Sequence, residues 1–404
     1  MAGINWLGLL QPEDASLPAQ PGGCARCHAG LGAKPNPVDQ LTDADYANVD
    51  CLICHAPDYS RTVVKEGETF KLAPADGVDV VAAAQSAQRP TADMCLRCHL
   101  KAAGGPNYKH GEVPTPGTDV HIDGGLHCVD CHYTENHKVA GGGYIIARDD
   151  IDYEVTCTNC HSEPVHAEEY AVINAHTDRI TCQTCHIPLI ARDPDLPTQM
   201  TRDYSQPVYN EARGLYGPKV EKQANVVPTY LWWNYWTKTP PEPVGSIDDP
   251  DSKISPWKPM QVTAPFDAAT GEPVYIKQGV YQITGSLDAA VTKGVEASGQ
   301  EYSGAWEPHA EGMYFDVQHQ VAPADQSLKC ADCHVPDGRM DFEALGYGSD
   351  QIATLTTLAA TAPETAPAEI PESGGMPAMP AWTVTTLVGL AALATSFVLR
   401  RRQR

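Results

Sequence analysis

The cysteine pattern limits what this chain can form more than any other feature. Its 404 residues include 14 cysteines, and all of them lie in Cys-x-x-Cys pairs that are followed directly by histidine. The seven motifs are Cys24/Cys27/His28, Cys51/Cys54/His55, Cys95/Cys98/His99, Cys128/Cys131/His132, Cys157/Cys160/His161, Cys182/Cys185/His186 and Cys330/Cys333/His334. This motif is typical of c-type haem attachment, in which both thiols bond to the porphyrin and the histidine reaches the iron. Half of a zinc site or a redox dithiol would not need a histidine after every pair. We therefore predict seven haems c.

The spacing of the motifs indicates what fills the core. Six of them lie within residues 24–186, so little chain separates one predicted haem from the next. Aromatic residues make up only 7% of the chain, which also contains 33 Gly and 34 Pro. Because this composition supplies few large side chains, we expect stacked haems to form the core. The predicted fold class is mainly α with extensive coil, in which short helices and loops wrap the haems, plus a C-terminal transmembrane helix.

A six-coordinate haem iron needs a second axial ligand, and histidine is a common one. The chain has 15 histidines, of which seven belong to the motifs. Among the others, His127 directly precedes Cys128, and we expect it to be too constrained to reach another haem. The remaining histidines are predicted distal ligands, although any one of them could instead lie at the surface. They are His110, His121, His137, His166, His176, His309 and His319.

The same spacing predicts the domain organisation. We expect a haem-dense domain at 1–186, a haem-poor insertion of loops and short strands at 187–308, and a seventh-haem segment at 309–350. Residues 351–380 are rich in Ala, Thr and Pro, which favours a solvated stalk. Residues 381–404 begin with a long uncharged stretch and end in a basic tail. That pattern predicts either a transmembrane anchor or a sorting helix that is removed after export.

The location of haem attachment predicts export. Haem is joined to Cys-x-x-Cys-His outside the cytoplasmic membrane, yet the first ten residues do not resemble a signal peptide. We therefore expect an upstream extension of the reading frame and an extracytoplasmic protein, either periplasmic or at the cell surface. The formal net charge of -23 excludes nucleic acid as a default partner. The expected partners are an electron-donor redox protein or quinol-linked cytochrome, a small-molecule acceptor, and the membrane through the C-terminal helix.

One acidic cluster could bind a second kind of metal. Asp248, Asp249 and Asp251 could offer carboxylate oxygens to calcium. The simpler interpretation is a solvated acidic turn, so calcium is only a weak expectation.

Several segments resemble the octahaem tetrathionate reductase family of multihaem c-type cytochromes. They run through most of residues 20–350, and the most specific is the stretch that contains the sixth motif. The matching segments are NVDCLICH (48–55), YKHG (108–111), DVH (119–121), CVDCH with NH (128–137), AHTDRITCQTCHIP (175–188), QHQVAP (318–323), LKCADCH (328–334) and GRMDFEALGY (338–347). The family carries eight haems, so its first haem would lie upstream of Met1, and most of its irons have two histidine ligands.

The resemblance also implies an active site. One haem of the family has a lysine as its second ligand, and Lys109 of YKHG falls at that position. The family is associated with reduction of tetrathionate, nitrite and hydroxylamine, so the resemblance implies an oxidoreductase with Lys109 at the reacting haem. Two features depart from the family pattern: Pro106 replaces an acid three residues before the lysine, and no cysteine lies outside the motifs. A non-catalytic electron conduit tethered at the cell surface therefore remains the alternative.

The haem count gives the first testable prediction. Protein made in a host that matures c-type cytochromes should carry seven covalently bound haems on residues 1–404, because each motif supplies both thiols. Intact-mass spectrometry of the denatured protein checks this number. A mass without added haem, or zinc found in its place, would contradict the assignment of the motifs.

Overall fold

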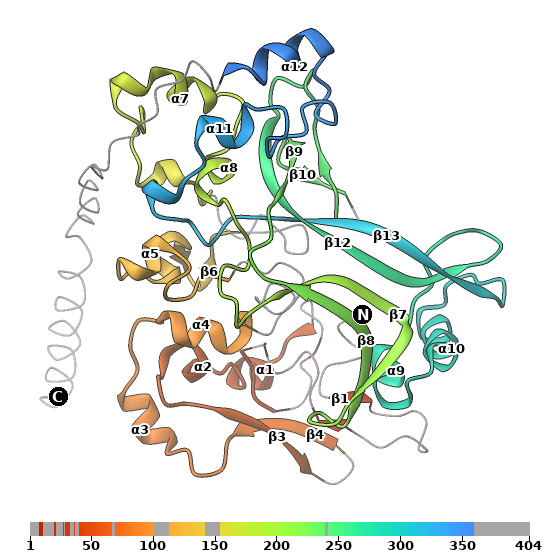
Figure 1. Ribbon diagram of the computed structural model, residues 1–404. Coiled ribbons are helices and arrows are strands. Elements are labelled where there is room, and N and C mark those ends of the chain that lie inside the picture. Colours follow the sequence, from red (N-terminus) through yellow and green to blue (C-terminus); the bar gives the residue numbers. More distant parts are fainter. Residues whose placement is uncertain are drawn as a thin grey trace, which may run out of the picture. The chain divides into compact units, whose positions relative to one another are not determined.

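The structure is a computed structural model, and it describes only part of the chain. The described residues are 8–10, 20–21, 27, 29–32, 36, 40–66, 69–100, 113–141, 154–238 and 241–358. The chain divides into two compact units, each described by itself below (Figure 1). The first comprises Met1–Val155 and Ala175–Ala366, and the second comprises Thr156–Asn174 and Pro367–Arg404.

The described haem motifs form short helices. A Cys-x-x-Cys pair occupies positions i and i+3, which share one face of a helix, so a single turn presents both thiols to the same side. Two of these helices are capped by an aspartate from within the motif: Asp130 accepts the backbone N–H of His127 at 2.7 Å, and Asp332 accepts that of Lys329 at 2.7 Å. The motif helices are α2 (Leu52–His55), α4 (Ala92–His99), α6 (Cys128–Cys131), the 3-10 helix η3 (Cys157–Asn159), α8 (Cys182–His186) and α11 (Cys330–Cys333).

The other described helices are also short. Most have no more than seven residues, and they connect the motifs or cover the sheet. They are α1 (Asp43–Ala47), α3 (Val80–Gln85), α5 (Val120–Asp123), the 3-10 helix η4 (Glu168–Tyr170), α7 (Ala171–His176), α9 (Gln278–Thr284), α10 (Leu287–Ser298), the 3-10 helix η5 (Ala324–Gln326) and α12 (Ser349–Leu355). Helix α12 extends into the first residues of the expected stalk.

A five-stranded sheet separates the sixth motif from the seventh in the sequence. Its strands are β7 (Thr198–Asn210), β8 (Leu215–Gln223), β9 (Thr229–Trp233), β12 (Lys253–Asp267) and β13 (Trp306–Asp316). The order is β13-β12-β7-β8, and β9 pairs with the first residues of β12. Strand β12 is antiparallel to β13 and parallel to β7 (Figure 1). This long strand therefore organises the sheet.

The other strands of the described residues form four small antiparallel ribbons. They pair β1 (Gly8–Leu10) with β2 (Gln20–Pro21), β3 (Arg61–Glu66) with β4 (Thr69–Pro74), β5 (Thr134–Glu135) with β6 (Lys138–Val139), and β10 (Trp236–Thr237) with β11 (Pro243–Val244).

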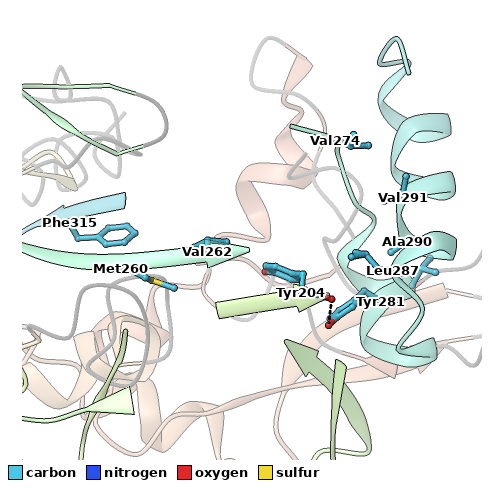
Figure 2. Packing of buried hydrophobic residues seen from close by; sticks show 10 residues of the cluster. Tyr204, Met260, Val262, Val274, Tyr281, Leu287, Ala290, Val291 and Phe315 are labelled. Atoms are coloured by element: carbon cyan, nitrogen blue, oxygen red, sulfur yellow. Dashed lines mark hydrogen bonds between the residues drawn. The ribbon is translucent and has the colours of Figure 1, made fainter. Parts of the chain in front are cut away.

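The largest side-chain core lies between the sheet and helices α9 and α10. Figure 2 shows Tyr204, Met260 and Val262 of the strands together with Tyr281 and Val291 of the helices. Tyr281 is fully buried, and its hydroxyl donates to the backbone oxygen of Tyr204 at 2.9 Å. Burial of these apolar side chains holds the two helices on the sheet, at about 25 cal/mol per Å² of apolar surface removed from water.

The expectation of a mainly α fold with only short strands is therefore wrong. Strands β7 and β12 span 13 and 15 residues, and the sheet has its own apolar core without a haem motif inside it. Proline explains the misreading, because it donates no hydrogen bond and is usually a mark against a central strand. Strand β12 nevertheless contains Pro256, Pro259 and Pro265.

The expected C-terminal transmembrane helix at 381–399 lies outside the described residues. Among the helices of the described ranges, none is long and apolar enough to cross a membrane.

Candidate functional site

Three motif histidines of the first unit each face one predicted distal histidine. The ring centroids are 6.2 Å apart for His55 and His137, 6.0 Å for His132 and His319, and 6.1 Å for His176 and His334. The angles between the ring planes are 75°, 34° and 15° in the same order. The separation is thus nearly constant, whereas the relative rotation of the rings is not.

That combination fits two imidazoles bonded to opposite sides of one metal ion. Two metal–nitrogen bonds of about 2 Å, plus roughly 1 Å from each nitrogen to its ring centre, place the centroids about 6 Å apart. Rotation about the bond axis changes the interplanar angle but not this distance. Each pair supplies only two protein ligands, and the residues described hold no cluster of three or more His, Cys, Asp or Glu that could bind a metal. The residues present therefore fit haem, whose porphyrin supplies the other four ligands.

The motif histidine of each pair is oriented by a backbone carbonyl. Its Nδ1 donates to the carbonyl of Gln88 for His55 at 2.9 Å, of Ala140 for His132 at 2.8 Å, and of Leu355 for His334 at 3.0 Å. A proton on Nδ1 leaves Nε2 as the metal ligand, and such partners fix both the tautomer and the ring orientation. Burial also lowers the pKa of His132 and His176, which favours the neutral imidazole that metal binding requires.

His121, another predicted ligand, has a carboxylate partner instead. Asp119 Oδ1 accepts the backbone N–H of His121 at 2.9 Å and lies 3.3 Å from its Nδ1. The hydrogen bond to Asp119 raises the pKa of His121. Burial by itself would raise the pKa of Asp119, but hydrogen bonds from His121 and the backbone of Val321 outweigh it, and that pKa is lowered.

The second unit contains the fifth motif and His166. Asn174 Oδ1 lies 3.1 Å from His166 Nδ1 and also accepts the backbone N–H of His166 at 3.1 Å, while Asn174 Nδ2 donates to the His166 carbonyl at 2.9 Å. Since the amide nitrogen already donates, its oxygen must accept from Nδ1, which places a proton of the imidazole on Nδ1. The motif residues Cys157, Cys160 and His161 begin at helix η3 of the same unit.

Motifs distant in the sequence are brought together in the first unit. The thiols of Cys95 and Cys128 lie close enough to interact with each other, as do those of Cys98 and Cys27. Cys185 in α8 lies close enough to Cys330 in α11 to interact with it electrostatically.

Two arginines form hydrogen bonds that link segments of different motifs. Arg97 of the third motif donates to the carbonyls of Ile53 and Ala56 at 3.0 Å each, which secures the C-terminal end of the second-motif helix. Arg339 donates to Pro188 O at 2.6 Å and so joins the seventh-motif segment to the sixth.

Other predicted site residues lie on the sheet and at the ends of motif helices. His309 lies in β13, exposed, with its ring centroid 4.7 Å from that of Phe266. His127 is the N-cap residue that directly precedes α6, and it is also exposed. His99 and His186 end α4 and α8. Cys24, His28, Lys109 and His110 lie outside the described residues.

The acidic cluster considered for calcium is used within its own turn. Asp249 Oδ2 accepts from Ser252 Oγ at 2.8 Å and from Asn234 Nδ2 at 3.0 Å, and Oδ1 accepts the backbone N–H of Asp251 at 3.0 Å. The solvated-turn interpretation accounts for these contacts.

Sequence reasoning missed the groups that orient the ligands. Three of them are backbone carbonyls, which carry no residue-type signal, and they lie 8 to 33 residues from the histidines that they orient. Asp119 had a signal, because it stands two residues before a predicted ligand in the DVH segment.

Gly141 gives a prediction about the His132 pair. This glycine has φ +111°, and a Cβ added there would lie 2.7 Å from His132 Nδ1. Gly141→Ala should displace the ring, weaken its bond to Ala140 and change the low-spin spectrum of one haem. Gly125→Ala is the matched control, because Gly125 has φ +88° but open space around the added Cβ.

Both of these substitutions should cost about 1–3 kcal/mol of backbone strain. Only Gly141→Ala should alter electron paramagnetic resonance of the haems, and identical spectra for the two variants would contradict the role of His132.

Comparison with known proteins agrees with this geometry. Residues 192–337 match the family model described as cytochrome c bacterial. A protein from Archaeoglobus fulgidus, described as uncharacterized, is 31% identical over 164 residues, which are 33% of this chain and 54% of that protein. The chain thus spans about half the length of this curated relative. The crystal structure of octaheme cytochrome c from Shewanella oneidensis is similar with a TM-score of 0.64 and 29% identity, over 82% of this chain and 81% of that one. The chain is thus similar to multihaem c-type cytochromes in its seven Cys-x-x-Cys-His motifs, in its facing imidazole pairs and in its fold.

Proposed function

We propose that this cytochrome delivers electrons to a small sulfur or nitrogen compound, such as tetrathionate, nitrite or hydroxylamine, at a haem whose distal ligand is Lys109. The observation that carries the proposal is the set of three facing imidazole pairs. An iron held by two imidazoles has no free position for a substrate, so these sites suit electron transfer. Catalysis then requires a haem with a weaker second ligand, and the family resemblance points to Lys109.

The ligand assignments belong to the same proposal. His137, His319 and His176 are the distal ligands of the haems attached at the second, fourth and seventh motifs. We assign His121 to the haem of the sixth motif because one short segment contacts both: Val321 O accepts the N–H of Val120 at 2.9 Å, and Ala322 N donates to His186 O at 2.8 Å.

We leave His309 out of the ligand set, since it packs on Phe266 in the sheet. Histidines 110, 121, 137, 166, 176 and 319, together with Lys109, then provide one distal ligand for each of the seven motifs.

Electrons would move between motifs that lie side by side. Neighbouring thiols of the third and fourth motifs, the first and third, and the sixth and seventh support this route, because each thiol is an attachment point of a haem edge. When bound, each haem supplies an iron that takes up and releases single electrons. The protein's contribution is to hold the imidazoles neutral and in place.

Lysine is suited to the reacting position because it is a weaker partner than imidazole. It can ligate iron only as the neutral amine, against an ordinary pKa of about 10.4. Desolvation and the metal charge both favour that form. Lys101 and Lys109 would also give an anionic substrate a local positive field in a chain of net charge -23.

The second candidate function is a non-catalytic electron conduit. It is favoured by the two-histidine character of every facing pair in the described part of the chain. Pro106 and the absence of a cysteine outside the motifs favour it as well. In either role we expect an extracytoplasmic protein that takes electrons from a redox protein or a quinol-linked cytochrome.

Removing one distal ligand tests the assignments. His176→Ala should convert about one haem in seven from low-spin to high-spin and let added cyanide bind there, because the iron attached at the seventh motif loses an imidazole. Absorbance and electron paramagnetic resonance measure both changes. His309→Ala is the control and should leave every haem low-spin. A high-spin haem in His309→Ala would restore that residue to the ligand set.

The catalytic proposal is tested at Lys109. Lys109→Ala should open one haem to added ligand and change turnover of tetrathionate, nitrite or hydroxylamine by a factor of ten or more, measured with reduced viologen as electron donor. Lys101→Ala removes the same charge nearby and should keep wild-type spectra. If the wild type turns over none of the three compounds and both variants keep its spectra, the conduit function is the better account.

A further inference from the structure

The carboxylate of Asp119 joins three parts of the haem-binding structure. It is 4% exposed, and both of its oxygens are used. Oδ1 faces His121 in α5, as described above. Oδ2 accepts the backbone N–H groups of Gln320 at 2.9 Å and Val321 at 3.0 Å. Gln320 directly follows the distal ligand His319, and Val321 precedes the residue that bonds to His186.

We propose that Asp119 is a positioning residue that strengthens His121 as an iron ligand and thereby holds the reduction potential of one haem low. The inference rests on the ligand role proposed for His121. It assigns Asp119 no contact with substrate, because the carboxylate acts through the imidazole.

The buried carboxylate of Asp119 carries a charge that needs a partner. A buried carboxylate must be paired or well hydrogen-bonded to remain ionised. Within the described ranges, no lysine or arginine forms an ion pair with Asp119, whereas His121 does. The carboxylate therefore brings its negative charge to the imidazole of His121.

His121 differs from three motif histidines in the group that faces its Nδ1. His55, His132 and His334 donate Nδ1 to neutral backbone carbonyls. A carboxylate accepts the same proton more strongly, which makes the imidazole a more basic ligand. A more basic ligand and a nearby negative charge both favour the ferric state. The haem bound by His121 should therefore have a lower reduction potential than it would have without Asp119. Hydrogen bonding beyond the ligands is a recognised control of haem potential.

The backbone conformation of Gln320 also depends on Asp119. Gln320 has φ +68°, in the left-handed region that a residue with a side chain seldom adopts, and it is only 2% exposed. Such a conformation persists only when its surroundings determine it. The hydrogen bonds from Gln320 and Val321 to Asp119 supply that determination, and the Gln320 side chain accepts the N–H of Arg192 at 3.2 Å. The position of the carboxylate is thus fixed from both sides.

The experiment compares Asp119→Asn with Asp123→Asn in the full-length, haem-loaded protein. Asp123 belongs to the same helix α5, but its carboxylate accepts the backbone N–H of Gly117 at 2.7 Å and forms no ion pair with a histidine of the described ranges. Both variants remove one negative charge near His121. Potentiometric titration, followed by absorbance and electron paramagnetic resonance, measures the potential and spin state of the haems.

In Asp119→Asn, one haem should shift to higher potential, and the other haems should keep theirs. Asp123→Asn should leave all potentials at the wild-type values. Unchanged potentials in Asp119→Asn, or equal shifts in the two variants, would overturn the proposal. If Asp119→Asn is not recovered with full haem content, Asp119→Ser removes the same charge with a small hydroxyl that can accept a backbone N–H, and the same shift is expected.

His121→Ala separates this inference from the ligand assignment on which it rests. One new high-spin haem in His121→Ala, together with unchanged potentials in Asp119→Asn, would refute only the role of Asp119. Low-spin spectra for every haem in His121→Ala would instead refute His121 as a ligand.

Discussion

The facing of two imidazoles across about 6 Å is the constraint on which the haem-binding part of this protein depends. His55 and His137 are 82 positions apart in the sequence, and the two histidines of each other pair are at least 158 positions apart. The chain must therefore fold so that short helices and loops meet at fixed distances. Side-chain burial contributes less there, because the apolar clusters around the motifs are small, as with Ile53, Ala56, Tyr59 and Ala83.

Orientation of these ligands depends on the backbone. The carbonyls of Gln88, Ala140 and Leu355 hold three motif imidazoles in one tautomer, and the Leu355 carbonyl comes from α12, in a stretch whose composition suggested a stalk. Asp119 is the exception among the groups that orient ligands, because it brings a charge. A protein that attaches chemically identical haems can differentiate them through such partners as well as through the ligands themselves.

The five-stranded sheet has a different physical basis. Its core of Tyr204, Met260, Val262, Tyr281 and their neighbours is made of side chains and contains no haem motif. The sheet nevertheless reaches the haem region, because β12 forms bonds beside the sixth motif: Thr184 in α8 donates its hydroxyl to Ile254 O at 2.9 Å. The sheet thus fixes the helix that carries Cys182 and Cys185.

The sequence alone determined the covalent chemistry, since a thiol pair followed by histidine has the same local geometry wherever it occurs. It also limited the distal ligands to a few histidines, because histidine is sparse. It could not determine the pairs, which depend on contacts between remote segments, nor show that His309 lies in β13 against Phe266. The sheet escaped prediction because Pro256, Pro259 and Pro265 obscure the strand pattern of β12. Tertiary hydrogen bonds and apolar packing between remote segments decided these features, and neither can be read from the order of residues along the chain.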